Sequence, residues 1–380
     1  MIFSFFVYIS LTYLMYYLGQ KYSSYNKLIY LFLLLFAYTF VFGTRYGVGI
    51  DHITYLKNYE NWDFMRDVNW LRYEPGFVLF TNICYDLSLS TALYFSIISF
   101  FMIGSLLFHY RKDRFIVPYI ALVFMISCTG ITGCTNGIRQ FMAISVLLLI
   151  FPFLCERRIL PYIGGVLVAT MFHKTAIILI PIYALTYIKD SVVRNRSFII
   201  ACCISMIAFV FIRLILGNTL LFFIDDALAI FEDNTYDNYL ETDYVNLRTS
   251  IGVFRLIKLC FGMWVASLLS QMSFFFKDKI KYFDKIALFW LVGTILYCLF
   301  EGSLVMQRMI LYLTIFEIYL YACLIYYLLN TRKYLVAVVL LIMSVNFVST
   351  ISNGENNSAR YVSIFQTSEH VQKEKELYMK

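Results

Sequence analysis

Residues 28–44 read LIYLFLLLFAYTFVFGT, an apolar run without a single charged side chain. A helix needs about 20 predominantly apolar residues to cross the hydrocarbon core of a bilayer, and this run is close to that length. Similar runs recur along the whole chain of 380 residues, of which 61% are hydrophobic and only 14% are charged. Because soluble domains carry about 25% charged residues, we predict an all-α polytopic integral membrane protein.

Twelve segments combine apolar length with few charges, and we predict that each is a transmembrane helix. They cover residues 2–19, 28–44, 91–109, 115–130, 140–155, 159–173, 175–188, 197–216, 251–276, 286–303, 309–329 and 335–350. Residues 76–90 are apolar but short, and Asp86 interrupts them, so we expect an interfacial or re-entrant half-helix there. The spans predict one membrane domain over residues 1–350, followed by a polar tail at 351–380.

The Lys and Arg residues gather in short clusters between the predicted spans, and the positive-inside rule assigns such clusters to the cytoplasm. The clusters are Lys21/Lys27, Arg111/Lys112/Arg114, Arg157/Arg158, Lys189/Arg194/Arg196, Lys277/Lys279/Lys281/Lys285 and Arg332/Lys333. With twelve spans, all of them fall on one side of the membrane, and both termini fall on the other. The remaining polar loops are then outer loops: 45–75, 131–139, 173–174, 217–250 and 304–308.

The charge and the cysteines exclude several functions. The Lys and Arg residues behind the net charge of +7 lie in the short clusters between spans, as topology signals do, so we expect no nucleic-acid partner. The nine cysteines are scattered through apolar segments without a CxxC pair, which predicts neither a zinc site nor a disulfide framework. Residues 1–19 lack a basic start and a cleavage site, so we expect a retained first helix.

Ionisable groups on the predicted outer side are candidates for function, because a charge at membrane depth costs a few kcal/mol. The first group is RYGVGID at residues 45–51. Arg45 offers a planar fork suited to phosphate oxygens, and the glycines allow close approach of the backbone to a ligand. Asp51 could orient the arginine or accept a proton. The alternative is an ordinary interfacial loop.

The second group is NGIRQ at residues 136–140, where a polar loop leads directly into an apolar helix. Backbone N–H groups and the positive end of the helix dipole favour an anion at such a position, and Arg139 adds a full charge. Gln140 is a further polar candidate there. The alternative is an arginine that extends to the lipid headgroups.

Further candidates follow along the chain. His173 could act as a base and Lys174 could bind phosphate, while Glu74, before Pro75 and Gly76, could serve as a base or hold an arginine. Arg248, Arg255 and Lys258 share one face of the helix predicted at residue 251 and could line a basic groove. Glu301 and Arg308 are similarly spaced, and we predict that Arg248, Arg255 and Arg308 help to bind diphosphate. For these two sets, structural ion pairs remain the alternative. Arg213 is interpreted as a residue that anchors its span at the interface.

Several cations with a candidate base fit a phosphate-bearing lipid substrate. Sugar transfer from such a lipid requires positive charge for the departing diphosphate and a base for the attacking hydroxyl. We infer no cofactor and no metal requirement, because the arginines could supply the charge and no carboxylate cage is visible.

Four motifs in order resemble the EpsG-like branch of Wzy-type polysaccharide polymerases: residues 45–51 with Tyr55, EPGF at 74–77, NGIRQ at 136–140 and FHK at 172–174. The family pattern usually has a small residue after the histidine, and Lys174 departs from it. The second half of the chain matches only as a hydrophobic pattern, so Arg248, Arg255 and Arg308 carry over poorly.

The resemblance implies a multi-pass enzyme of the bacterial inner membrane with its active face outside. It would polymerise repeat units linked to undecaprenyl diphosphate, extending O-antigen (the polysaccharide of lipopolysaccharide), capsule or exopolysaccharide by glycosyl transfer. Arg45 and Arg139 would bind diphosphate, and Asp51, Glu74 or His173 would be the base. The expected partners are the lipid-linked glycan, the bilayer and a chain-length co-polymerase. The alternatives are an O-antigen ligase and a polysaccharide-lipid flippase or transporter.

Overall fold

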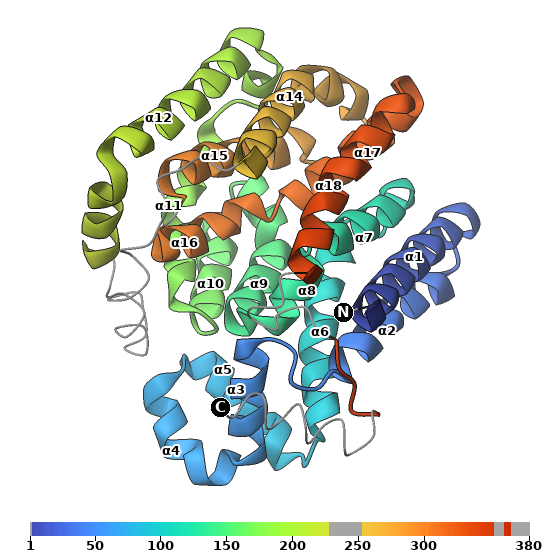
Figure 1. Cartoon of the computed structure of the whole chain (residues 1–380), viewed down its shortest axis with the longest axis vertical. Coiled ribbons are helices and arrows are strands. Elements are labelled where there is room, and N and C mark those ends of the chain that lie inside the picture. Colours follow the sequence, from blue (N-terminus) through green and yellow to red (C-terminus); the bar gives the residue numbers. More distant parts are fainter. Residues whose placement is uncertain (1, 228–252, 302, 353–360, 366–380) are drawn as a thin grey trace. The chain divides into compact units, whose positions relative to one another are not determined.

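The computed structural model describes residues 2–227, 253–301, 303–352 and 361–365, which are helical apart from turns and short loops (Figure 1). These residues contain no β-strand, and one isolated antiparallel bridge joins Arg45 to Ser363. The all-α prediction is therefore confirmed.

Seven helices in the described residues are long and apolar enough to cross a membrane, or up to nine if each of two bent pairs is one span. The seven are Ile2–Tyr25, Thr91–Phe108, Ile138–Cys155, Arg196–Ile215, Leu256–Phe276, Phe283–Phe300 and Tyr334–Ser352. Three shorter apolar helices are Leu28–Gly43, Ile159–Thr170 and Lys174–Tyr187. Every one of the predicted spans falls on one of these helices or pairs, so the chain is a polytopic membrane protein.

The chain divides into two compact units. Unit 1 comprises Met1–Ile150, Leu167–His173 and Tyr321–Lys380, and unit 2 comprises Phe151–Val166 and Lys174–Leu320. The chain therefore passes from one unit to the other between His173 and Lys174.

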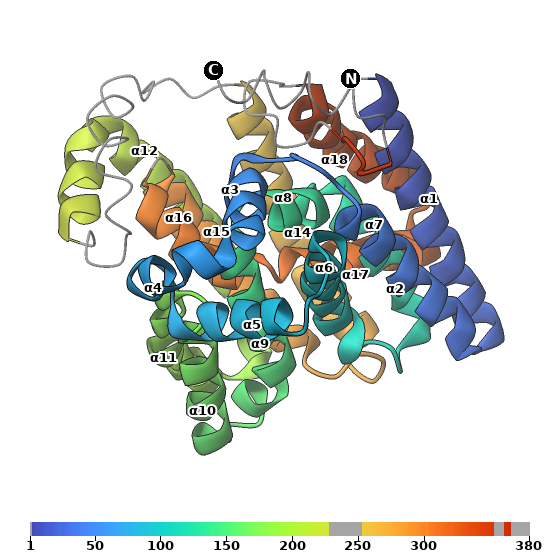
Figure 2. The ribbon, with the colours of Figure 1, turned by 90° about the horizontal axis from the view of Figure 1, so that it is seen from below.

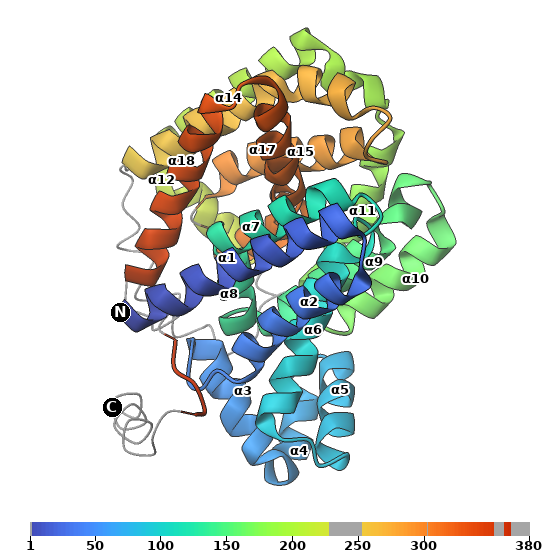
Figure 3. The ribbon, with the colours of Figure 1, turned by 90° about the vertical axis from the view of Figure 1, so that its right-hand side faces the viewer.

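Unit 1 is built on four packed helices. Helix α2 (Leu28–Gly43) lies against α1 (Ile2–Tyr25) and α6 (Thr91–Phe108), and α1 also packs on α7 (Val117–Ile126), as Figure 3 shows. These segments are apolar on nearly every face, as expected of helices that have lipid on one side and other helices on the other. Helices α8 (Thr129–Thr135) and α18 (Tyr334–Ser352) and most of α9 (Ile138–Cys155) also belong to this unit.

The loops of unit 1 meet at the two ends of α1. At one end the Tyr22 hydroxyl donates to the Arg111 carbonyl at 2.6 Å, which joins the last turns of α1 to the turn that follows α6. At the other end the Tyr361 N–H donates to Ser4 Oγ at 3.0 Å. The 24 residues of α1 correspond to about 36 Å of helix, so the two ends are well separated. This arrangement agrees with the predicted alternation of loops, and the membrane side of each end stays a prediction.

Residues 45–75 were expected to form an outer loop, but they contain two helices, α3 (Ile50–Glu60) and α4 (Trp62–Arg72). Helix α5 (Pro75–Asp86) follows, where the half-helix was predicted. Helix α3 packs on α6, and α4 packs on both α3 and α5 (Figure 2). Tyr55, Tyr59 and Trp62 recur at helical spacing and are buried, which explains why this polar segment folds into helices.

Other segments also differ from the prediction. The expected loop 131–139 begins inside α8, and the expected loop 304–308 is the start of α16 (Leu304–Thr314), capped by Ser303, whose Oγ accepts from the Met306 N–H at 3.1 Å. The span predicted at 309–329 breaks before α17 (Glu317–Thr331), with a bend of 41°.

Unit 2 contains α12 (Arg196–Ala227), which packs on α14 (Val253–Phe276) and α15 (Phe283–Phe300), while α15 also packs on α16. Before them come α10 (Ile159–Thr170, partly in unit 1) and the short elements η2 (Lys174–Ile178), α11 (Leu179–Ile182), η3 (Tyr183–Tyr187) and η4 (Asp190–Arg194). The expected loop 217–250 is helical as far as Ala227, and the rest of it, with Arg248, lies outside the described residues.

Candidate functional site

Five side chains from four segments of unit 1 meet in one place, which we call the Glu74 cluster: Tyr55, Tyr73, Glu74, Arg139 and His173. Tyr55 comes from α3, Tyr73 and Glu74 from the junction of α4 and α5, Arg139 from the first turn of α9, and His173 from the turn after α10. Three of the four motifs singled out in the sequence, together with Tyr55, contribute to it.

Glu74 and Arg139 form a nearly buried ion pair. Arg139 Nη1 donates to Glu74 Oε2, and Arg139 Nε donates to the Tyr55 hydroxyl at 2.7 Å. The Arg139 guanidinium carbon lies 4.9 Å from the centre of the Tyr73 ring, a distance suited to a cation–π contact. The side chains of Arg139 and Glu74 are only 14% and 9% exposed, so water screens their attraction weakly.

The second oxygen of the same carboxylate faces His173. His173 Nδ1 lies 3.2 Å from Glu74 Oε1, and the histidine side chain is 9% exposed. Burial by itself raises the pKa of Glu74, but the hydrogen bond with His173 and the charge of Arg139 outweigh it and lower the pKa to about 2. Glu74 is therefore an ionised acceptor that links an arginine to a histidine.

The backbone explains why His173 lies beside Glu74. The N–H groups of Gly76 and Phe77, at the start of α5, both donate to the Met171 carbonyl, at 2.8 and 3.3 Å. A Cβ atom on Gly76 would lie 2.7 Å from Met171 Cβ and 2.8 Å from its carbonyl oxygen, so only glycine permits this approach. The EPG motif thus binds the turn that carries His173.

A second set of backbone contacts places Arg139. The Gly137 N–H, just before α9, donates to Asp51 Oδ2 at 2.5 Å, which holds a carboxylate at the positive end of that helix. Gly49 has φ of +89°, and a Cβ atom there would lie 2.5 Å from the Thr135 carbonyl oxygen. Residues 45–51 therefore pack against residues 135–137, and Asp51 positions the helix that carries Arg139.

Arg45 does not reach the Glu74 cluster through any described contact. Its side chain is buried in unit 1, where Nη1 donates to the Phe42 carbonyl and Nη2 to the Cys134 carbonyl. Its guanidinium also lies over the Phe95 ring at 5.0 Å. Two of the guanidinium nitrogens thus bind backbone carbonyls in the interior, which indicates a structural role, and the role of Arg45 as a phosphate ligand stays a prediction. Burial and the charge of Arg45 also hold the pKa of the neighbouring His52 well below its ordinary value.

The segment around Arg45 is also bound by residues near the end of the chain. The Tyr46 N–H donates to the Val362 carbonyl at 2.8 Å, and the Ile364 N–H donates to the Thr44 carbonyl at 3.0 Å. Part of the predicted polar tail is therefore paired with the first motif.

Comparison with known families agrees with this geometry, since the model of the EpsG family matches residues 28–363. The chain belongs to the EpsG family. Membership indicates a polymerase-type function in polysaccharide biosynthesis, in keeping with the transmembrane fold. No curated protein and no solved structure matches this EpsG-family chain.

The remaining candidates of this EpsG-family chain are distributed over several elements of the two units. Gln140 is buried in α9. Lys174 begins η2 in unit 2, Arg308 lies in α16 of that unit, and the backbone of Arg255 lies in α14. Glu301 lies directly after the last turn of α15. It binds Arg213 at 2.6 Å, so Arg213 is part of a nearly buried ion pair and not simply an interface anchor.

Tyr73 was not among the residues predicted from the sequence. Its hydroxyl accepts from Asn58 Nδ2 at 2.6 Å, and its ring faces the Arg139 guanidinium. An aromatic residue directly before the EPG motif was the available signal. No group of three or more His, Cys, Asp or Glu side chains that could hold a metal ion occurs in the parts of the chain that the structure describes.

Proposed function

We propose that this protein polymerises oligosaccharide repeat units carried on undecaprenyl diphosphate, at the outer face of the bacterial cytoplasmic membrane. The product is the longer lipid-linked glycan used for O-antigen, capsule or exopolysaccharide. The observation that carries the proposal is the Glu74 cluster, in which one buried carboxylate holds a histidine and an arginine at the start of a helix.

Arg139 is the proposed diphosphate ligand. A guanidinium matches two phosphate oxygens at once, and the start of α9 adds the positive end of a helix dipole. Glu74 and Tyr55 hold this guanidinium in one orientation, which reduces the ordering required when substrate binds. The positive charge then stabilises the diphosphate as it leaves.

His173 is the proposed general base. A carboxylate whose pKa is about 2 is a weak base, which argues against Glu74 in that role. It is instead a suitable acceptor for the N–H of His173 Nδ1, and in that tautomer the lone pair of the imidazole is on Nε2. Asp51, bound to the Gly137 N–H, has the role of positioning α9.

The reaction transfers the growing chain to a new repeat unit. The terminal hydroxyl of the new unit attacks the anomeric carbon of the growing glycan, and its proton passes to His173 Nε2. A carbon–oxygen bond forms at the anomeric carbon, and the bond between that carbon and the diphosphate oxygen breaks. Undecaprenyl diphosphate leaves with the bonding pair, and its negative charge is neutralised at Arg139. No oxidant or reductant is required.

The test uses purified protein in lipid vesicles with a defined undecaprenyl-diphosphate-linked repeat unit, and measures longer products by mass spectrometry. Arg139→Lys keeps the charge but removes the planar fork, so we expect about 100-fold slower polymerisation. Arg66→Lys is the matched control, because Arg66 forms exposed ion pairs with Asp63 and Asp86 on α4 and α5, and it should keep its rate within twofold.

Two results would contradict the proposal. One is wild-type activity in Arg139→Lys, which would remove the diphosphate role. The other is a wild-type protein that makes no longer product but attaches the repeat to a lipid A-core acceptor, which would identify a ligase.

A further inference from the structure

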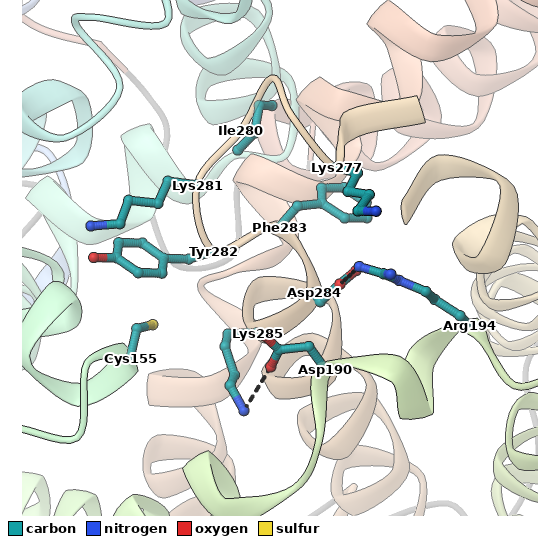
Figure 4. Close-up of a pocket in the computed structure, with 10 residues that line it drawn as sticks. All are labelled: Cys155, Asp190, Arg194, Lys277, Ile280, Lys281, Tyr282, Phe283, Asp284 and Lys285. Carbon is teal, nitrogen blue, oxygen red and sulfur yellow. Dashed lines mark hydrogen bonds and ion pairs between the residues drawn. The ribbon is translucent and has the colours of Figure 1, made fainter. Parts of the chain in front are cut away.

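Unit 2 has a pocket of about 340 Å³, and none of the residues that line it belongs to the Glu74 cluster. It lies between η4 and the hairpin that joins α14 to α15 (Figure 4). Four basic side chains line it, against two acidic ones: Arg194, Lys277, Lys281 and Lys285, with Asp190 and Asp284. Basic residues from two clusters that are far apart in the sequence thus converge on one cavity.

Both carboxylates of the pocket are already neutralised. Asp284 Oδ2 accepts from Arg194 Nη2 at 2.5 Å, and Asp190 Oδ1 lies 2.9 Å from Lys285 Nζ. The Lys285 ammonium is almost buried and also donates to the carbonyls of Thr186 and Ile188, at 2.9 and 2.7 Å. These contacts fix the side chains at the floor of the pocket. The positive charge that remains is carried by the lysines at its rim.

Lys277 and Lys281 form that rim, and both are exposed. Lys281 binds Glu156 at 2.9 Å, and the same carboxylate accepts from the Tyr282 hydroxyl at 2.5 Å. Lys277 has no hydrogen bond or ion pair with another residue that the structure describes. An ammonium on a partly enclosed wall, beside the fork of Arg194, suits the oxygens of a phosphate group.

The position of the pocket favours a lipid as the source of that phosphate. It lies where two apolar helices end, and Phe274, in the last turn of α14, is 65% exposed while its ring lies 5.7 Å from the Arg194 guanidinium. An exposed aromatic ring beside cationic groups is typical of the boundary between lipid tails and headgroups. The positive-inside rule places these loops at the cytoplasmic leaflet, which carries anionic lipids.

We propose that this pocket binds the phosphate group of an anionic membrane lipid at the cytoplasmic surface. The same chemistry would accept a soluble phosphate or diphosphate. Neither the proposal nor its test depends on polymerase activity.

The test is native mass spectrometry of the full-length protein released from detergent, with added phosphatidylglycerol or phosphatidylcholine. We expect tighter binding of the first phosphatidylglycerol, and about fivefold weaker binding of it in Lys277→Ala, because one basic residue at an anionic surface contributes about that factor. Lys279→Ala is the matched control. Lys279 is exposed on the same hairpin but lies 3.5 Å above the Phe275 ring and does not line the pocket, so its affinity should change less than twofold.

The result decides between specific binding and general attraction. Three results would overturn the proposed lipid site: phosphatidylglycerol binding that is weakened equally in both variants, binding that is weakened in neither, or equal affinity for phosphatidylcholine. A parallel thermal-shift titration with inorganic diphosphate distinguishes a lipid from a soluble anion. The pocket would be assigned to a soluble anion if diphosphate stabilises the protein, Lys277→Ala weakens this stabilisation, Lys279→Ala retains it and phosphatidylglycerol is not preferred.

Discussion

Arg45 and Arg139 each lie between a glycine-containing stretch and an apolar helix. Within unit 1, however, their guanidinium groups have different kinds of partner. The guanidinium of Arg45 is buried and donates to the carbonyls of Phe42 and Cys134. The guanidinium of Arg139 instead binds a carboxylate and a phenol that also belong to the proposed site. An arginine whose hydrogen bonds go only to backbone carbonyls serves the fold, while one held by polar side chains can be oriented towards a substrate.

Asp51 and Glu74 differ in the same way. Asp51 accepts from the Gly137 backbone N–H, whereas Glu74 lies between the ionisable side chains of Arg139 and His173. The first motif therefore supports the site, and the EPG motif is part of it. Three predictions test this division.

The largest effect is expected for Arg45→Ala. The change leaves two buried carbonyls without their donor and opens a cavity, so the free energy of unfolding should fall by about 4 kcal/mol. The amount of folded protein in the membrane should fall with it. Fluorescence size-exclusion profiles and thermal unfolding of the purified protein measure this. A stable Arg45→Ala protein that has lost only polymerase activity would return Arg45 to the substrate site.

The second prediction concerns the pH dependence of stability. The pKa of Glu74 is about 2 in the folded protein, below its ordinary value of 4.5, so the folded state binds a proton less readily than the unfolded state. Its contribution is present above pH 4.5 and is lost as the pH falls from 4.5 towards 2. The loss should amount to about 3 kcal/mol, at about 1.4 kcal/mol per pKa unit.

Glu74→Gln removes this titration, so the variant should show a flatter stability profile between pH 6 and pH 3 than the wild type. Denaturant unfolding in detergent at a series of pH values measures the difference. Parallel profiles would mean that Glu74 is not the ionised centre of the cluster.

The smallest effect is expected for Asp51→Asn. An amide oxygen can still accept from the Gly137 N–H but without the negative charge, so the start of α9 should lose about 1 kcal/mol and the polymerisation rate should fall about fivefold. Asp67→Asn, on the exposed face of α4, is the control and should leave the rate unchanged. A loss of more than a thousandfold in Asp51→Asn would make Asp51 the base instead of a positioning residue.

Local pattern predicted the apolar segments well and the polar ones poorly. A span is recognisable from composition because lipid requires an apolar surface along the whole helix, and residues 91–109 predict α6 within one residue. Helices α3 and α4 were not predicted, because their sequences differ from that of a polar loop only in a few aromatic residues, such as Tyr59 and Trp62, which the structure buries. Their burial against the rest of unit 1 is a tertiary property.

The amino-acid sequence predicts that this chain is helical, that it belongs in a membrane and that its notable polar residues fall in four short motifs. It could not determine which of those residues meet. Glu74 contacts Arg139 across 65 positions and His173 across 99, and such contacts depend on how whole helices pack. The packing of the helices places Arg139 in the Glu74 cluster, whereas it directs Arg45 towards backbone carbonyls. Burial and hydrogen-bond partners come from segments that are distant in the sequence, so neighbouring residues do not predict them.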